Sequence, residues 1–355
     1  MTEVDDPYRP SKWATRGLTA LFLVVALGSV LALVPSNYVI LKPGPTTNIL
    51  GRGEGSKPIV TISGHASYPA RGHLNFTTVR QVGDPEDRAS LLDVLIAAVS
   101  PSQDVYDMDL LYPPGTTAKD AEAENAAEMT DSQQVATAVA ARSIGAEVTE
   151  RTIVSSVPDG SPAKDVLRGG DQITSIDGTP VSDGDQIRAA VQKHKPGESL
   201  ALVVLRGGRS IDLTTRTRDS DGRTVMGILL GRSFTVPFQV NIDVGQVGGP
   251  SAGLMLSLGI RDLLTPGDLT GGKDIAGTGT MSPDGKVGPI GGIAQKVVGA
   301  RGDGADWFLA PADNCADLDG RVPDGLHVIK VTTFDDALAS VEKIASGATR
   351  ELPHC

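Results

Sequence analysis

An uncharged run from Gly17 to Val34 constrains the fold of this 355-residue chain more than any other feature. Its length and composition predict one transmembrane helix, which satisfies its own backbone hydrogen bonds in lipid. Basic residues precede the run and Pro35 closes it. The positive-inside rule therefore predicts a cytoplasmic tail at residues 1–16 and an extracytoplasmic remainder, at the plasma membrane. A cleaved signal peptide is the alternative, although no small-x-small cleavage site follows the run.

The composition of the whole chain is that of a globular protein, with 40% hydrophobic and 21% charged residues, and the length allows two or three domains. A net charge of −11 and only 4% aromatic residues argue against a nucleic-acid partner, because phosphate is repelled and few bases can stack. The five histidines are scattered and no Cys-x-x-Cys occurs. We therefore expect no metal and no other cofactor.

Cys315 and Cys355 are the only cysteines, and both lie in the part expected outside the cell, where disulfides persist. A bridge between them would fasten the tail at residues 347–355 to the last domain and contribute roughly 4 kcal/mol on the chain-entropy model. Two unpaired thiols are the alternative, because the sequence does not give the distance between the Cα atoms.

The region after the apolar run, residues 35–144, has the alternating pattern of an α/β layer. Lys42 to Pro58 is rich in Gly and Pro, and we expect it to be a connecting arm. The remaining periodicity predicts strands and helices in alternation, with strands at 59–63 and 74–82 and helices at 90–99 and 121–143. This region is expected to be the first half of a larger domain.

Residues 145–220 have a different pattern from the region before them. Short strands rich in β-branched residues surround one helix, which is expected at 185–194. The order of the strands and three motifs resembles a PDZ domain, whose Asp-Gly pair makes a tight turn. The motifs are Asp159-Gly160-Ser161-Pro162-Ala163, Leu167-Arg168-Gly169-Gly170-Asp171-Gln172-Ile173 and Ile176-Asp177-Gly178-Thr179-Pro180-Val181. The resemblance implies a groove that binds peptide segments between a strand edge and the helix.

The carboxylate-binding loop is where this sequence departs from the PDZ pattern. The nearest match, Gly145-Ala146-Glu147-Val148, has Glu147 in place of the second glycine. Capture of a free C-terminus is therefore not expected. A PDZ fold that serves only as a spacer or lid is the alternative, since a fold does not dictate a function.

A glycine-rich segment surrounds the candidate nucleophile, Ser251. Pro250 suits the first turn of a helix, so Ser251 is expected at a helix N-terminus, where free N–H groups and the dipole favour negative charge. Gly249 and Ala252 have almost no side chain, so substrate can approach and an oxyanion can be supported here. A serine that merely caps the helix is the alternative.

Lys296 is the candidate base. A helix from Gly292 places Ile293, Lys296, Val297 and Ala300 on one apolar stripe. Burial lowers the pKa of a lysine and makes a neutral amine available as a general base. A lysine that reaches water from the edge of the stripe is the alternative.

Three segments resemble the serine, strand-turn and lysine motifs of the Lon (S16) protease domain, in the same order and at near-identical spacing. The resemblance implies that Ser251 is the nucleophile, Lys296 its general base and Thr278 a supporting hydroxyl. The segments are Pro250-Ser251-Ala252-Gly253, Thr278-Gly279-Thr280-Met281-Ser282-Pro283-Asp284-Gly285-Lys286-Val287 and Pro289-Ile290-Gly291-Gly292-Ile293-Ala294-Gln295-Lys296. In this register Gly248 replaces an acidic residue and Thr280 a glutamate, which bears on substrate preference.

Residues 221–346 are expected to form this Lon-like domain. Residues 128–136 weakly resemble the Ala-rich helix in the first portion of the family's domain, so we expect the PDZ module to be inserted into one Lon-like domain. Three domains in sequence are the alternative, and pairing of the strand from Ile59 with the serine-containing half would distinguish the two. The expected fold class is α/β, with a Lon-type α+β proteolytic domain, a small β-rich PDZ domain and one preceding transmembrane helix.

The combined resemblance implies a membrane-anchored serine endopeptidase similar to a PDZ-containing Lon-like family of Gram-positive bacteria and actinobacteria. Gly267 to Lys273 nearly matches a phosphate-binding P-loop, but Asp274 stands at the next position, where a P-loop needs Ser or Thr to bind magnesium. ATP independence is therefore expected. The expected partners are polypeptide substrates, peptides in the PDZ groove, the membrane through residues 17–34 and, by resemblance, further copies of the chain. A non-catalytic PDZ adaptor on a Lon-like scaffold and an envelope serine hydrolase or acyltransferase are the alternatives.

Overall fold

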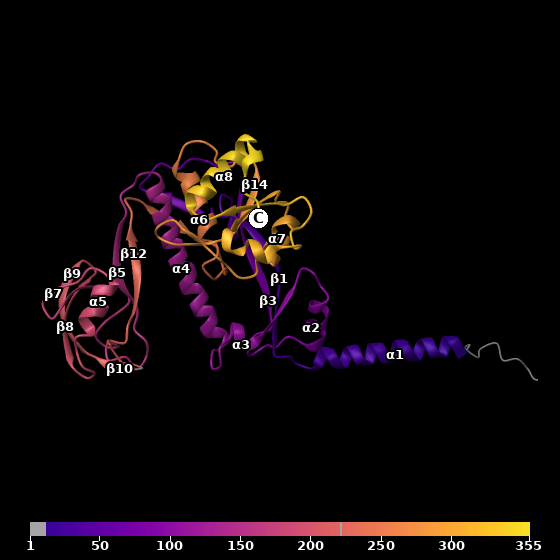
Figure 1. Ribbon diagram of the computed structural model, residues 1–355, viewed down its shortest axis with the longest axis horizontal. Helices are drawn as coiled ribbons and strands as arrows, with labels where there is room; N and C mark the ends of the chain where they lie inside the picture. The colour runs from indigo at the N-terminus through magenta and orange to yellow at the C-terminus, as the bar shows by residue number, and fades with distance from the viewer. Residues whose placement is uncertain (1–11, 221) are drawn as a thin grey trace, which may run out of the picture. The chain divides into compact units, whose positions relative to one another are not determined.

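The computed structural model describes residues 12–220 and 222–355, which form two compact units (Figure 1). The larger unit comprises Met1–Val139 and Val240–Cys355, and the smaller unit comprises Ala140–Gln239. The smaller unit is thus an insertion in the chain of the larger one. Most of the expected cytoplasmic tail, and Asp221 at the expected domain boundary, lie outside the described residues.

Helix α1, Lys12–Leu33, contains the apolar run. Its segment Thr15–Leu33 is long and apolar enough to cross a membrane. Large side chains along it, such as Leu18 and Phe22, are exposed.

A six-stranded sheet forms the centre of the larger unit, in the order β18-β17-β14-β3-β1-β4. Its strands are β1 Tyr38–Asn48, β3 His73–Val82, β4 Asp104–Asp107, β14 Asp274–Gly277, β17 Trp307–Pro311 and β18 His327–Val331. Strand β14 pairs in parallel with β3, so His73 lies opposite Asp274, 201 residues later. A second pairing joins β2, Val60–Ser63, to β13, Gln239–Ile242. The strand predicted from Ile59 therefore does pair with the serine-containing half.

The prediction of a connecting arm at Lys42 to Pro58 is wrong for its first half, because β1 continues to Asn48 and pairs with β3 up to that residue. The register between β1 and β3 shifts between Pro43 and Thr46, and β4 pairs with β1 only as far as Leu41. Proline lacks the N–H that a strand must donate. A bulge with a single partner strand tolerates it.

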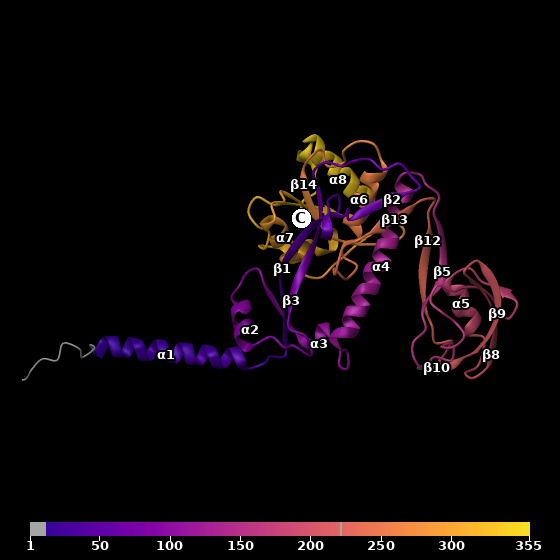
Figure 2. The same ribbon diagram turned by 180° about the vertical axis from the view of Figure 1, so that it is seen from behind.

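Helices cover the sheet of the larger unit (Figure 2). They are α2 Leu91–Ala98, α3 Met108–Leu111, α4 Ala118–Ser143, α6 Gly253–Leu264, α7 Ile293–Gly302 and α8 Phe334–Ser346, with short 3-10 turns η1 Glu54–Ser56, η2 Ala312–Leu318 and η3 Thr349–Glu351. Both ends of α8 are capped: Thr333 forms a capping box with Asp336, and Gly347 ends the helix in the left-handed region. Helix α7 packs on β1 and β3, with Gly299 close to the carbonyl of Gly44.

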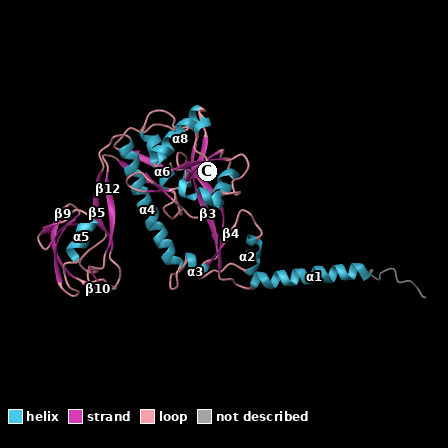
Figure 3. Ribbon diagram, in the orientation of Figure 1, coloured by secondary structure: helices cyan, strands magenta, loops and turns pink. Residues whose placement is uncertain are grey.

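The smaller unit is a β-rich fold around one helix (Figure 3). Its elements are β5 Thr149–Ser156, β6 Gln172–Ile176, β7 Thr179–Pro180, α5 Gly184–Val191, β8 Ser199–Arg206, β9 Arg209–Arg216, β10 Arg218–Ser220, β11 Arg223–Val225 and β12 Leu229–Thr235. Four strands form a sheet in the order β7-β6-β8-β9. Strand β12 pairs with β5. The compact unit therefore extends past residue 220, where the PDZ domain was expected to end, to Gln239.

Gly145 ends helix α4. Its φ of 76° is left-handed, and the N–H groups of Gly145 and Ala146 donate to the carbonyls of Arg142 and Ala141. These two N–H groups therefore satisfy the C-terminus of α4. They are not free to hold a peptide carboxylate.

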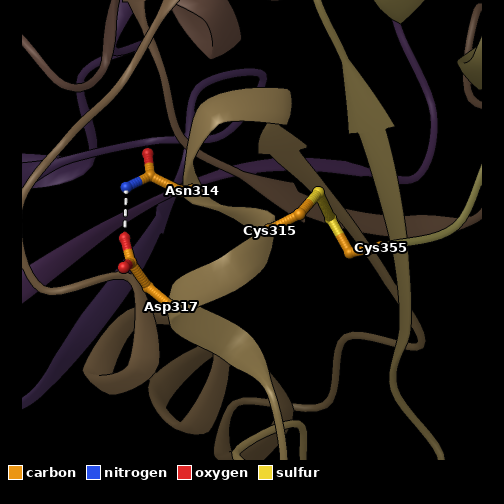
Figure 4. The surroundings of a disulfide bond; sticks show 4 residues. All are labelled: Asn314, Cys315, Asp317 and Cys355. Carbon is orange, nitrogen blue, oxygen red and sulfur yellow. Dashed lines mark hydrogen bonds between the residues drawn. A yellow bond between two sulfur atoms is a disulfide. The ribbon is translucent and has the colours of Figure 1, made fainter.

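A disulfide joins Cys315 in η2 to Cys355, with Cα atoms 5.0 Å apart (Figure 4). The backbone beside it also pairs, since Cys355 N–H donates to the carbonyl of Val328 and Lys330 N–H to that of Pro353. The C-terminal tail is thereby fastened to β18 and η2.

Candidate active site

The larger unit brings Ser251 and Lys296 together from segments 45 residues apart. Lys296 Nζ lies 2.9 Å from Ser251 Oγ and 3.2 Å from Thr278 Oγ1. The hydroxyl of Thr278 donates to the carbonyl of Ser251 at 3.1 Å. Three residues singled out by the sequence therefore form one hydrogen-bonded cluster.

Lys296 is buried in the apolar stripe of α7. Only 3% of it is exposed, and Ile293, Val297 and Ala300 of the same stripe are buried as well. Burial lowers the pKa of Lys296 from 10.5 to about 7, because an ammonium ion loses its hydration. No acidic side chain among the described residues forms an ion pair with it. The alternative of a lysine that reaches water does not apply.

Ser251 precedes its helix rather than beginning it, because α6 starts at Gly253 with Ala252 as its N-cap. The carbonyl of Ser251 accepts from Gly279 N–H at 2.9 Å as well as from the hydroxyl of Thr278. Within the described chain, no hydrogen bond uses the N–H groups of Ser251 and Ala252. These two donors lie at the helix N-terminus, where negative charge is favoured.

The N–H group of Gly249, which was expected to help support an oxyanion, already has a hydrogen-bond partner. Its N–H donates to the carbonyl of Asn125 at 2.8 Å, and its φ of 83° is left-handed. Asn125 lies on helix α4. A second residue of this helix also contacts the serine loop, because Ser132 Oγ donates to the carbonyl of Pro250. A Cβ on Gly248 would lie 2.8 Å from Asn125 Cβ. Gly248 and Gly249 thus let the loop sit directly against α4.

Asn125 and Ser132 are site residues that the sequence did not reveal. The Ala-rich pattern predicted the helix, but an asparagine and a serine on a polar helix have no motif of their own. Their role follows from a contact between segments more than one hundred residues apart. Only the packing of α4 against the serine loop identifies them.

A cavity of about 260 Å³ opens beside the cluster and includes Ser251 and Lys296 in its wall. Its other lining residues include Phe76, Thr77, Thr78, Val79, Met129 and Val247. Strand β14 pairs with β3 only as far as Phe76, whereas β1 pairs with β3 through to Val82. Among the described strands, Thr77 to Val79 therefore present an open strand edge next to the serine.

Among the residues that the structure describes, neither a metal site nor a phosphate site accompanies the cluster. The described residues contain no group of three His, Cys, Asp or Glu side chains that could hold a metal ion. The near-P-loop from Gly267 to Lys273 leads into strand β14. A P-loop places phosphate at a helix N-terminus, so this segment has a different geometry.

Comparison with known proteins assigns both modules. Residues 125–217 match the family model of the PDZ domain, and residues 239–343 match that of the Lon protease (S16) C-terminal proteolytic domain. The chain therefore contains a PDZ domain and a Lon-type proteolytic domain, which is a serine peptidase domain. The predicted combination of the two is confirmed.

Individual relatives agree with this assignment. Lon protease 1 of Sorangium cellulosum is 38% identical over 123 residues, covering 32% of this chain and 15% of the relative. The mitochondrial Lon protease homolog of Drosophila melanogaster is 40% identical over 91 residues, covering 25% and 9%. The chain thus spans less than a fifth of the length of these relatives. The solved PDZ domain of the SdrC-like protein from Listeria monocytogenes is 29% identical. The match covers 22% of this chain and 86% of that domain's chain, with a TM-score of 0.22.

Proposed function

We propose that this chain is an ATP-independent, membrane-anchored serine endopeptidase in which Ser251 is the nucleophile and Lys296 the general base. The observation that carries the proposal is the 2.9 Å contact between the two side chains. A hydroxyl needs a base within hydrogen-bond reach, and a lysine can be one only if its pKa is lowered. Burial does this for Lys296, with a pKa of about 7.

Thr278 sets the direction of proton transfer. Its hydroxyl proton is directed to the carbonyl of Ser251, so its lone pairs face Lys296 Nζ and accept an N–H. A neutral amine has one lone pair, which can then accept the proton of Ser251. Thr278 is a positioning residue in this scheme, because it acts through the lysine.

The reaction has two halves. Lys296 takes the proton from Ser251 as Oγ attacks the peptide carbonyl, and the N–H groups of Ser251 and Ala252 stabilise the oxyanion. The protonated Lys296 then gives its proton to the leaving amine as the C–N bond breaks, which leaves an acyl-enzyme. Lys296 then deprotonates a water molecule, which attacks the ester carbonyl. As the C–Oγ bond breaks, the protonated Lys296 returns this proton to Ser251 Oγ and the carboxylic acid is released. Each half returns the lysine to its neutral form, and neither half needs ATP.

A polypeptide is the substrate that the surroundings of the serine favour. The open edge of β3 at Thr77 to Val79 borders the cavity, and an extended peptide can pair with such an edge. The PDZ domain is of a class that also binds extended peptides. We propose that it engages polypeptides, whether to recruit or to regulate.

Extracytoplasmic location is supported by two independent features. The segment Thr15–Leu33 can cross a membrane, with basic residues before it. Cys315 and Cys355 are joined, and disulfides persist in oxidising compartments. We propose a single span with the N-terminus in the cytoplasm. Assembly of several copies stays a prediction from resemblance.

An acylating probe for active serines tests the proposal on the full chain in lipid nanodiscs. We expect wild type to be labelled and to cleave an unfolded protein substrate, and Ser251→Ala to do neither. Ser257→Ala is the matched control, because Ser257 lies on α6 with its hydroxyl bonded to the carbonyl of Gly253. Labelling with turnover of esters but not of peptides would indicate a hydrolase or acyltransferase instead. A chain that is folded but not labelled would indicate an adaptor.

A further inference from the structure

Helix α2 carries an apolar face that the larger unit leaves uncovered. Leu95 and Ile96 are each 53% exposed and Val99, just past the helix, is 84% exposed. The opposite face packs inward through Ala97 against a small core that includes Ile40. A helix that is apolar all round is normally buried on all sides.

The position of α2 is fixed by the end of the membrane helix. Leu91 N–H donates to the carbonyl of Val34 at 2.9 Å, and Ser36 N–H donates to that of Ala89 at 2.8 Å. Pro35 and Ser90 form an isolated β-bridge. Both views of the larger unit show α2 beside the end of α1 (Figures 1 and 2).

Simple dimensions place this face near lipid. The 19 residues of Thr15–Leu33 span about 28 Å as a helix, which is close to the roughly 30 Å of the hydrocarbon core. Val34 then lies at the boundary, and the polar headgroup layer extends roughly 5–8 Å further. Leu95 and Ile96 are little more than one helical turn from Leu91, so they lie within that layer.

Charge argues for lipid and against a second copy of the chain. The parts of the larger unit after the span contain 16 basic and 28 acidic side chains, so two such units repel each other. Between Leu91 and Val99 the only charged residue is Asp93, whose carboxylate is held in the capping box of α2. An apolar face without basic residues can enter a lipid surface by burial alone.

We propose that Leu95, Ile96 and Val99 dock the larger unit onto the outer surface of the bilayer in which α1 is anchored. This inference rests on the proposed membrane anchoring. The contact would hold α2, and the sheet on which it packs, against the lipid instead of leaving the unit free on a tether. Because burial is the driving force, the contact does not require anionic lipid.

Depth measurement with nitroxide labels tests the proposal. The two native cysteines pair with each other, so one introduced cysteine can be labelled selectively in the full chain under non-reducing conditions. We choose Leu95→Cys and Ile96→Cys, with Leu23→Cys as a reference within the span and Glu342→Cys, at an exposed position of α8, as a reference in water. Collision with oxygen, which concentrates in lipid, is compared with collision with a water-soluble nickel chelate.

We expect the labels at 95 and 96 to be more accessible to oxygen and less accessible to nickel than the label at 342, although less so than the label at 23. This result is expected in zwitterionic and anionic vesicles alike. Adding Ile96→Glu should shift the label at 95 toward the water reference without unfolding the protein, because Ile96 is exposed. Accessibility at 95 and 96 equal to that at 342, with the label at 23 in lipid, would overturn the docking but leave the anchoring intact. A water-like label at 23 would instead refute the anchoring, and docking with it. Label-label broadening at 96 that survives dilution into excess lipid would show that a second copy covers the face, which also overturns the proposal.

Discussion

Asp171 of the smaller unit and Lys296 of the larger unit are both buried ionisable side chains, but their surroundings are opposite. In the smaller unit Asp171 is 1% exposed and bonds to Arg206 through Nε at 2.7 Å and Nη2 at 2.6 Å. In the larger unit Lys296 is 3% exposed and meets only two hydroxyl groups. One buried group is neutralised by a partner of opposite charge, and the other is not.

The pKa values follow from this difference. Burial would raise the pKa of Asp171, but hydrogen bonds from Arg206 and from Arg168 N–H, with the charge of the arginines, outweigh it and leave the pKa lowered. Asp171 therefore stays ionised and fixes the turn before β6. Burial of Lys296 meets no such compensation, and its pKa falls to about 7. A buried group that is fully paired holds a fold together, whereas one without a counter-ion is available for proton transfer.

The largest effect should follow from removing the unpaired amine. Lys296→Met keeps the length and apolar stem of the side chain, so the fold should persist while peptide cleavage falls roughly 10²–10⁴-fold, the contribution of a general base. Cleavage of an unfolded protein substrate by the purified full chain measures this loss. Lys286→Met is the control, because Lys286 is exposed and pairs with Asp284. Near-normal cleavage by Lys296→Met would refute the role of the lysine.

Breaking the pair of Asp171 and Arg206 should lower the stability of the smaller unit rather than the rate of peptide cleavage. Asp171→Asn leaves Arg206 without its counter-charge, and we expect the smaller unit to lose about 3 kcal/mol of unfolding free energy. This unit contains no tryptophan, so hydrogen exchange of β6 and β8 followed by mass spectrometry is the suitable measurement. Asp185→Asn should change little, because its pair with Arg188 is exposed. Equal protection of β6 and β8 from hydrogen exchange in Asp171→Asn and Asp185→Asn would mean that the pair of Asp171 and Arg206 does not stabilise the smaller unit.

The buried amine should also make stability depend on pH. Below a pKa of about 7 the folded protein must keep an ammonium ion in an apolar site, whereas the unfolded chain keeps its proton up to about 10.5. The penalty is therefore complete at low pH and shrinks as the pH rises between these values. Lys296→Met should gain about 2 kcal/mol more stability at pH 7 than at pH 9. Denaturation followed by the fluorescence of Trp307 measures it, and a pH-independent difference would contradict the low pKa.

The smallest effect is expected at Thr278. Thr278→Val keeps the shape but removes the acceptor for Lys296 and the donor for the carbonyl of Ser251. The loss of about 1 kcal/mol should reduce kcat roughly five- to tenfold. Thr278→Ser, which keeps the hydroxyl, should retain most of the activity. If both variants behave alike, the hydroxyl does not orient the lysine.

The sequence revealed the residues whose placement follows from local pattern. The glycine-rich turn indicated Ser251 and the apolar stripe of α7 indicated the burial of Lys296, because both depend on a few neighbouring residues. The sequence pattern did not predict which strands pair across long separations in the chain. Strand β1 was taken for an arm because its prolines and glycine resemble a loop, and only pairing with β3 makes it a strand. That β12 belongs to the smaller unit was not predicted for the same reason, since it joins this unit only through its pairing with β5.

The pH dependence of Ser251 acylation tests the central claim most directly, because it reports the protonation state of Lys296 before any substrate-dependent step. The second-order rate of labelling by a neutral acylating probe is measured from pH 5 to 10 on the wild-type full chain. With a buried lysine of pKa about 7 as the base, the rate should rise about tenfold per pH unit below pH 7 and level off above pH 8. A rate that is flat across this range, or that keeps rising to pH 10, would contradict the account.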